Sequence, residues 1–332
     1  MSKYFRRFLP FSIFHQTSSI AACRTMKYKA EFILFIITVL WAGTFVIIKP
    51  VLEIISPMVF VSVRFVLASI ILLFVFRKRV FNIPKPTIRM GSVLGFFLFA
   101  GFVVQTIGLK YTTATKSALI TGTFVVFTPI LQLVVERKPP KMGSVIGVVL
   151  VFLGMLSLSS SEESLNKFIL TIGSDFNIGD FLTLICALCF AGYIVYLDMI
   201  SDKTEYRDLV WIQILFTAVG AVISMFVFHW SSIEEITFTL NSQVVWTVIY
   251  TTVFATIITT FLQTRYQRLT TPTRAAVIFT CEPLIASILA YLILSETIGI
   301  FSIIGGALII FGVFTSEILD DLISKFNSGS SS

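Results

Sequence analysis

The stretch from residue 58 to residue 76 reads MVFVSVRFVLASIILLFVF, and its only charged residue is Arg64. A helix needs about 20 mostly apolar residues to cross a hydrocarbon core of ~30 Å, and this stretch meets that requirement. It does not alternate polar and apolar residues, as a strand of a membrane β-barrel would. Backbone amides in lipid must form hydrogen bonds within their own segment, so we expect residues 58–76 to form a membrane-spanning helix.

The rest of the chain has the same character. Of its 332 residues, 56% are apolar and 13% are charged, and the mean hydropathy is +0.93. Soluble proteins carry roughly a quarter charged residues, so these values exclude an ordinary soluble domain. Ten runs are long and apolar enough to span: 32–52, 58–76, 90–109, 115–135, 142–160, 179–198, 208–230, 243–264, 273–294 and 298–317. The predicted fold class is therefore all-α, a polytopic membrane protein with ten transmembrane helices.

The basic residues predict how the chain is oriented. If the N-terminus is inside, 20 of the 25 Lys and Arg residues lie on the cytoplasmic side and four on the opposite side. Short cytoplasmic loops retain Lys and Arg, so we expect both termini to be cytoplasmic and the protein to lie in the cell membrane. The formal charge of +7 then belongs to these loops and does not indicate a nucleic-acid partner.

Two end segments flank the predicted spans. In the N-terminal segment, residues 1–30, phenylalanine recurs at every third position, at Phe5, Phe8, Phe11 and Phe14. This spacing is typical of an interfacial amphipathic helix, although Pro10 would interrupt it. Alternatively, the true start is Met26, directly before the first span. No cleaved secretory signal is expected, and residues 318–332 are predicted to be a cytoplasmic tail.

The chain contains an internal repeat. A shift of 158 residues lays 105–154 over 263–312 with 14 identities in 50 positions, against roughly 10% expected by chance. A shift of 149 lays Ala42-Gly43 over Ala191-Gly192. We therefore predict two five-helix halves, residues 31–160 and 179–317, joined by an extracytoplasmic linker over 161–178. Because five is odd, the halves enter the membrane in opposite directions, an arrangement typical of secondary transporters.

Several short motifs follow one another in an order that resembles a known family. They are Trp41-Ala-Gly-Thr44, Thr112-Thr-x-Thr-Lys-Ser-Ala118 leading to Thr128-Pro129, Glu282-Pro283 followed by Leu-Ser-Glu296, and Gly305-Gly306 with Gly312. Over about residues 30–317 the chain is similar to the EamA-type branch of the drug/metabolite transporter superfamily. The resemblance implies export or uptake of small metabolites such as amino acids, without ATP hydrolysis, through a central cavity between the halves.

Two charged residues within the predicted spans are candidates for function. Glu282 lies nine residues into its span, roughly 13.5 Å at helical rise, and so close to the bilayer centre. It could bind a proton or a substrate amine, or it could bond structurally to a neighbouring helix, and Pro283 should loosen the helix beside it. Arg64 could partner Glu282 or a substrate carboxylate. The alternatives for Arg64 are a structural ion pair and a side chain that reaches the interface.

Further candidates come in pairs under the repeat. Lys116 overlays Arg274, and inversion would place these cations at the two mouths of the cavity, unless they merely snorkel to the interface. Gln105 overlays Gln263, and each amide needs a partner, so each either lines the cavity or bonds another helix. The rings of Trp41 and Tyr193 could face an organic substrate or simply pack.

Glycines with close-packing spacing are predicted to be structural. Gly147 and Gly154 overlay Gly305 and Gly312, and each pair is two helical turns apart. Such spacing lets helices approach closely, either within the chain or between the chains of a homodimer.

The sequence also indicates what the protein lacks. It has no phosphate-binding Gly-rich loop, no metal-ligand spacing and no nucleophile motif, so we expect no cofactor and no metal. We predict a secondary transporter, more specifically an exporter, of a small organic metabolite, with protons as a further partner. The alternative is an intramembrane enzyme that acts on a lipid or a lipid-linked intermediate.

Overall fold

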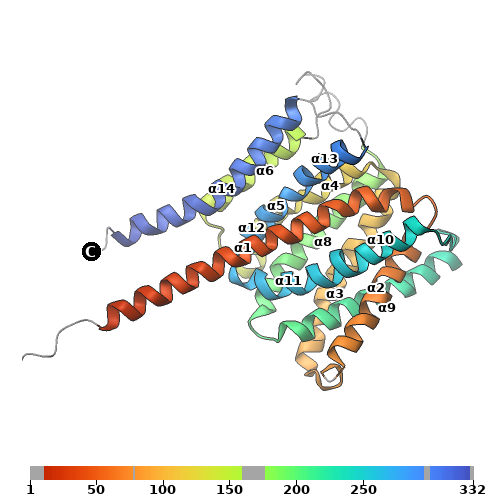
Figure 1. Cartoon of the computed structure of the whole chain (residues 1–332), viewed down its shortest axis with the longest axis horizontal. Helices are drawn as coiled ribbons and strands as arrows, with labels where there is room; N and C mark the ends of the chain where they lie inside the picture. The colour runs from red at the N-terminus through yellow and green to blue at the C-terminus, as the bar shows by residue number, and fades with distance from the viewer. Residues whose placement is uncertain (1–10, 78, 159–175, 295–299, 330–332) are drawn as a thin grey trace, which may run out of the picture.

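The computed structural model describes residues 11–77, 79–158, 176–294 and 300–329, and Figure 1 shows a bundle of helices. The elements are α1 (Phe11–Val51), α2 (Pro57–Phe76), η1 (Val80–Asn82), α3 (Lys85–Tyr111), α4 (Ala114–Gly122), α5 (Phe124–Leu131), η2 (Gln132–Glu136), α6 (Met142–Leu158), α8 (Ile178–Ser201), α9 (Tyr206–Trp230), α10 (Ser242–Thr252), η3 (Val253–Ile258), α11 (Thr259–Tyr266), η4 (Gln267–Leu269), α12 (Pro272–Phe279), α13 (Cys281–Leu294) and α14 (Ile300–Gly329). The only β-type pairing in these ranges is an isolated bridge between Ile55 and Phe238. The predicted all-α class is confirmed for the described residues.

The helices match the predicted spans. Among the described residues, eight helical segments are long and apolar enough to cross a membrane: Met26–Val51, Pro57–Phe76, Lys85–Tyr111, Lys116–Glu136, Ile178–Ser201, Tyr206–Trp230, Ser242–Leu269 and Pro272–Ile293. Two shorter apolar helices, Met142–Ser157 and Ile303–Ser316, coincide with the fifth and tenth predicted spans. The protein is therefore a polytopic membrane protein.

Two of these spans are broken near their middle. The span Lys116–Glu136 is interrupted at Thr123, between α4 and α5, and the span Pro272–Ile293 is interrupted at Thr280, between α12 and α13. Pro283 contributes to the second break, as the sequence predicted, because it has no N–H to donate back toward α12. Under the 158-residue shift the two breaks agree to within one residue. Discontinuous helices of this kind commonly form the binding sites of transporters.

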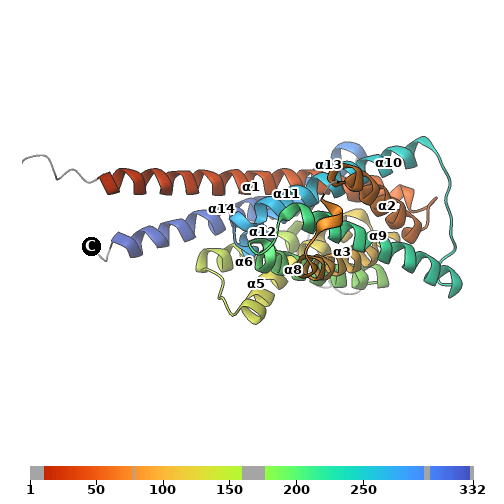
Figure 2. The same cartoon turned by 90° about the horizontal axis from the view of Figure 1, so that it is seen from below.

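The two end helices extend past the rest of the bundle at the same end, as Figures 1 and 2 show. Helix α1 has 41 residues and begins directly after Pro10, and α14 has 30 residues. Termini at one end agree with an even number of crossings, while their cytoplasmic placement stays a prediction. Residues 1–10 and 330–332, together with most of the predicted linker 161–178, lie outside the described residues.

Helices from the two predicted halves pack closely against each other. Helix α3 lies along α8 and α9, and small residues bring their backbones together. A Cβ atom added at Gly108 would lie 2.8 Å from the carbonyl oxygen of Gly179, and one added at Gly95 would lie 3.0 Å from the carbonyl oxygen of Gln213. The interior of the protein is therefore an interface between residues 31–160 and residues 179–317.

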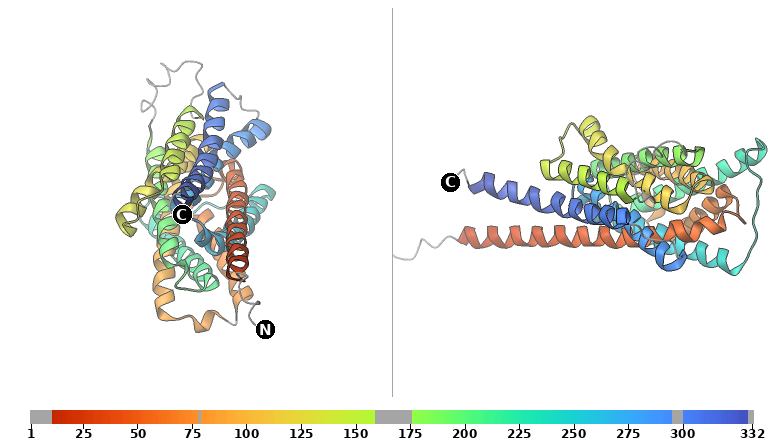
Figure 3. Two further views of the ribbon diagram at one scale, coloured as in Figure 1. Left: turned by 90° about the vertical axis from the view of Figure 1, so that its left-hand side faces the viewer. Right: turned by 90° about the horizontal axis from the view of Figure 1, so that it is seen from above.

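The glycine pairs of the sequence join α6 to α14, which lie side by side in Figures 1 and 3. A Cβ atom added at Gly147 would lie 2.8 Å from the carbonyl oxygen of Gly312, and one at Gly154 would lie 2.7 Å from that of Gly305. The close packing predicted for these glycines is therefore found within one chain.

Replacing Gly154 with Ala is expected to destabilise the protein by about 1–3 kcal/mol, because the new methyl group meets backbone atoms that cannot move away. The measurement is thermal unfolding of the detergent-solubilised protein. Gly306→Ala is the matched control, since a Cβ atom there meets only the flexible end of Leu284. Equal losses of thermal stability in the two variants would contradict this account of the α6–α14 contact.

Candidate binding cavity

A cavity of about 60 Å³ lies where the broken helices meet the rest of the bundle. Its walls come from α1, α2, α3, α4, α5, α8, η3, α11, α12 and α13. Six of the eight candidate residues line it: Trp41, Arg64, Gln105, Tyr193, Gln263 and Glu282. Residues that are scattered over the sequence therefore meet at one site, whose mostly apolar wall carries a few polar groups.

Most of the cavity wall consists of residues that the two sequence shifts relate to one another. The pairs are Trp41 with Phe190, Thr44 with Tyr193, Phe45 with Ile194, Phe102 with Thr260, Gln105 with Gln263, Thr121 with Phe279, and Phe124 with Glu282. The cavity is thus framed by equivalent positions of the two predicted halves. At one pair the two halves carry different residue types, because Phe124 is equivalent to Glu282. Among the described lining residues, the second half therefore contributes a carboxyl group that the first half lacks.

Glu282 occupies the first turn of α13, two residues after the break at Thr280. Its side chain is buried, and in the described part of the chain it makes no hydrogen bond or ion pair. Its neighbours on the wall include an aromatic cluster in which the rings of Trp41 and Phe279 lie 5.2 Å apart. A buried carboxyl group without a protein partner is costly unless a ligand or proton meets it.

Arg64 lines the same cavity and is held by hydrogen bonds to η3. Its Nε donates a hydrogen bond to Oγ1 of Thr256 at 2.6 Å, and its Nη2 donates one to the carbonyl oxygen of Ala255 at 3.0 Å. The guanidinium carbon also lies 4.5 Å from the centre of the Phe102 ring. Of the alternatives that the sequence leaves open for Arg64, an ion pair with Glu282 is not formed in the described part of the chain, and the buried side chain does not reach the interface. Both bonds go to the π-helical segment η3, where the altered hydrogen-bond ladder lets a carbonyl accept from side chains.

The remaining polar liners are fixed by hydrogen bonds. Gln105 donates to Oγ1 of Thr121 at 3.3 Å. Gln263 donates to Oε1 of Gln267 at 2.9 Å, and the hydroxyl of Tyr193 donates to Oε1 of Gln213 at 2.9 Å. These bonds orient the groups before any ligand arrives, which lowers the entropy lost on binding.

Lys116 and Arg274 lie outside the cavity wall. The Nζ of Lys116 lies 2.6 Å from Oδ2 of Asp180, and Nη1 of Arg274 lies 3.6 Å from Oε1 of Glu31. Arg274 is only 4% exposed, so it does not snorkel to the interface. The sequence analysis missed both carboxylates, because they lie near span ends where charges are common. The signal was present, since the shift of 149 that aligns Ala42 with Ala191 also lays Glu31 over Asp180.

The size of the cavity limits what this conformation can hold. A volume of about 60 Å³ accommodates a few water molecules. Pockets for small molecules typically measure roughly 300–1,000 Å³. An organic solute therefore fits only after the helices around the cavity separate.

Comparisons with known proteins show which family the chain belongs to. A family model described as the EamA-like transporter family matches residues 28–160 and again residues 177–317. A protein of Archaeoglobus fulgidus named an uncharacterized transporter is 30% identical over 288 residues, which cover 86% of this chain and 85% of the relative. A S-adenosylmethionine/S-adenosylhomocysteine transporter of Chlamydia muridarum is 31% identical over 98 residues, which cover 28% of this chain and 30% of that protein. One crystal structure has the same fold, with a TM-score of 0.69 and 14% identity over 89% of this chain and 99% of that chain.

Proposed function

Because the chain belongs to the EamA-like transporter family, we propose that it moves a small organic metabolite across the cell membrane by alternating access. The family and the transporter names of its relatives make it a membrane transporter. The two moving parts would be the inverted repeats over residues 31–160 and 179–317. Each repeat would take up in turn the conformation of the other, so that the central cavity faces one side of the membrane at a time.

The observation that carries this proposal is the composition of the cavity wall. Seven pairs of lining residues occupy equivalent repeat positions, and the two helix breaks flank the cavity from both halves. A structural core does not need rare polar groups in lipid, because each of them is costly there. An enzyme acting on a lipid would need its polar cluster at the membrane interface, whereas these groups are buried at the junction of the halves.

The chemistry of the wall favours a solute with both an ammonium and a carboxylate group, such as an amino acid. Glu282 offers a carboxylate, Arg64 offers the N–H groups of Nη1, and Gln105 and Gln263 offer amides beside aromatic faces. S-adenosylmethionine, which the name of the Chlamydia relative mentions, carries such an amino-acid group. We further propose that transport is export, and that Glu282 exchanges the solute for a proton.

The test uses the purified full chain in liposomes. Thermal stabilisation by a panel of amino acids, amines, nucleobases and lipid precursors identifies ligands, and flux of the radiolabelled ligand is then measured with and without a pH gradient. We expect flux of an amino-acid-like solute, accelerated by an opposing proton gradient and without chemical change of the solute. Chemical turnover without flux would overturn the transporter proposal in favour of an enzyme.

A further inference from the structure

In the described part of the chain, two of the ion pairs that connect the predicted halves occupy equivalent positions of the repeat, and neither touches the cavity. Arg79 makes further ion pairs between the halves, with Asp208 at 2.7 Å and with Glu205 at 3.7 Å. Of the two equivalent pairs, one joins Lys116 of α4 to Asp180 of α8, and the other joins Arg274 of α12 to Glu31 of α1. In each pair, a cation from the fourth predicted span of one half meets a carboxylate at the start of the first predicted span of the other half; Glu31 directly precedes the predicted span 32–52, and Asp180 lies within 179–198. The carboxylates are equivalent under the shift of 149 residues, and the cations are equivalent under the shift of 158.

The local structure around the two cations is also equivalent. The backbone N–H of Lys116 donates to Oγ1 of Thr113, which caps α4, at 3.1 Å. The backbone N–H of Arg274 donates to Oγ1 of Thr271, which caps α12, at 3.3 Å. A cation in the first turn of a helix is unfavourable beside the positive end of the helix dipole. In both helices the carboxylate from the opposite half offsets this cost.

The two ion pairs lie at opposite ends of the bundle. Asp180 accepts a hydrogen bond from Thr112 at 2.6 Å, just after the end of α3. Lys49, near the end of α1, donates to the carbonyl oxygen of the same Thr112 at 2.7 Å. Glu31 precedes Lys49 by 18 residues on the continuous helix α1, which is about 27 Å along its axis. One pair therefore closes each end of the junction.

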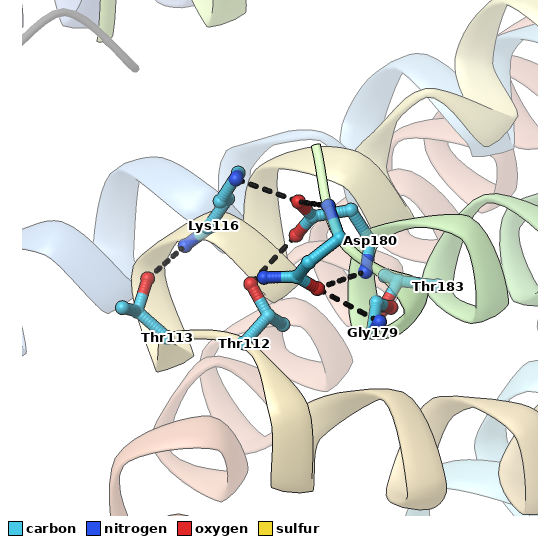
Figure 4. A network of polar contacts seen from close by, with 7 residues as sticks. Thr112, Thr113, Lys116, Gly179, Asp180 and Thr183 are labelled. Carbon is cyan, nitrogen blue, oxygen red and sulfur yellow. Dashed lines mark hydrogen bonds and ion pairs between the residues drawn. The ribbon is translucent and has the colours of Figure 1, made fainter. Parts of the chain in front are cut away.

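Figure 4 shows the first ion pair within a network of hydrogen bonds. The carboxylate of Asp180 accepts from Thr112 and from the backbone N–H of Asn177, and the side chain of Asn177 caps α8 in return. In the second pair, the carboxylate of Glu31 lies between Arg274 and Lys27, at 3.6 Å and 3.8 Å. Both pairs are made in a conformation whose cavity is only about 60 Å³ in volume.

We propose that these two ion pairs are the latches of the transport cycle, one at each end of the cavity. Separating Lys116 from Asp180 opens one end, and separating Arg274 from Glu31 opens the other, so the cycle breaks them in alternation. This inference rests on the proposed alternating-access function. Its physical basis is that each latch connects helices of opposite halves, so each can persist only while its own end of the junction stays closed.

The experiment measures from which side the cavity can be reached. The reporter is Thr121→Cys on the cavity wall, in a chain whose four native cysteines are replaced by Ala or Ser. A membrane-impermeant thiol reagent is applied to right-side-out and to inside-out membrane vesicles. Asp180→Asn is expected to raise the labelling rate about tenfold from one side, and Arg274→Gln about tenfold from the opposite side. Each variant shifts the equilibrium toward the state that is open at its own end, and this coupling free energy sets the size of the effect.

Controls separate a latch from a merely structural ion pair. Lys138→Gln removes an ion pair between two residues of the same half, with Glu136, and is expected to leave both labelling rates unchanged. Lys116→Gln should reproduce Asp180→Asn. Arg274→Gln leaves the buried carboxylate of Glu31 without its ion pair to Arg274, which can prevent folding. In that case the double variant Glu31→Gln/Arg274→Gln replaces it.

The outcomes decide clearly between the alternatives. Side-specific increases in opposite directions support the latches. Increases from the same side, or unchanged labelling in folded variants of both pairs, would overturn them. Labelling does not require substrate, so side-specific labelling in a chain without flux would count against the proposed function and leave the latches supported.

Discussion

Replacing Glu282 with Gln is expected to reduce proton-driven transport to the rate of protein-free liposomes while the helical bundle stays folded. The carboxyl group is buried and has no protein partner in the described part of the chain, so it can take up and release a proton without disrupting a structural bond. Glutamine keeps the shape and the hydrogen-bonding capacity of the protonated acid but cannot ionise. Coupling is then lost, because Glu282 carries the one carboxyl group among the described residues that line the cavity.

The measurement is solute flux into proteoliposomes with and without an imposed pH gradient. Glu53→Gln serves as the matched control, because Glu53 is an exposed carboxylate in the connection between α1 and α2. Exchange of internal for external solute at equal pH tells whether Glu282 also holds the substrate. If Glu282→Gln retains exchange, Glu282 binds only the proton. If the variant loses exchange, Glu282 also binds the amine of the substrate. Full proton-dependent flux in Glu282→Gln would refute the assignment.

The sequence predicted the members of the cavity better than it predicted their contacts. Glu282, Gln105 and Gln263 could be identified because polar groups in lipid are rare and costly, and because the two amides coincide under the repeat. The partners of Arg64 could not be identified, since they depend on the π-helical segment η3, and nothing in the residue types of 253–258 distinguishes it from an ordinary apolar helix. Tertiary packing decides where such a segment forms.

The helix breaks show the same limit. The break at Thr280 could be anticipated from Pro283, which removes a backbone donor. The break at Thr123 has no proline nearby, since Pro129 lies six residues further along; its one local signal is Gly122, a weaker helix breaker that ends α4, and the break was found only in the structure. Likewise, Glu31 and Asp180 were not identified from the sequence, because they lie near span ends, where charges are common. Only the observed contacts with Arg274 and Lys116 show that these carboxylates connect the two halves.

Replacing Arg64 with Met is expected to weaken binding of carboxylate-bearing solutes by a factor of roughly 10–150, the equivalent of a charge-assisted hydrogen bond of about 1.5–3 kcal/mol. Arg64 lines the cavity and uses Nε and Nη2 to bond η3, so the N–H groups of Nη1 remain for a ligand carboxylate. Arg64→Lys keeps the charge but loses the planar fork of donors, so an intermediate loss is expected. The measurement is calorimetric titration with an amino acid and with the amine that lacks its carboxylate.

The structural role of Arg64 must be separated from this binding role. Removing the guanidinium also leaves Oγ1 of Thr256 without its donor and takes away one of the two donors to the carbonyl oxygen of Ala255, which by itself destabilises the fold around η3. Thr256→Val breaks the bond to Nε but keeps the guanidinium, and it should lower thermal stability without distinguishing the two solutes. If Arg64→Met weakened the amino acid and the amine equally, Arg64 would only brace η3. A selective loss of binding of the amino acid would place the substrate carboxylate at Arg64, in the cavity that Glu282 also lines.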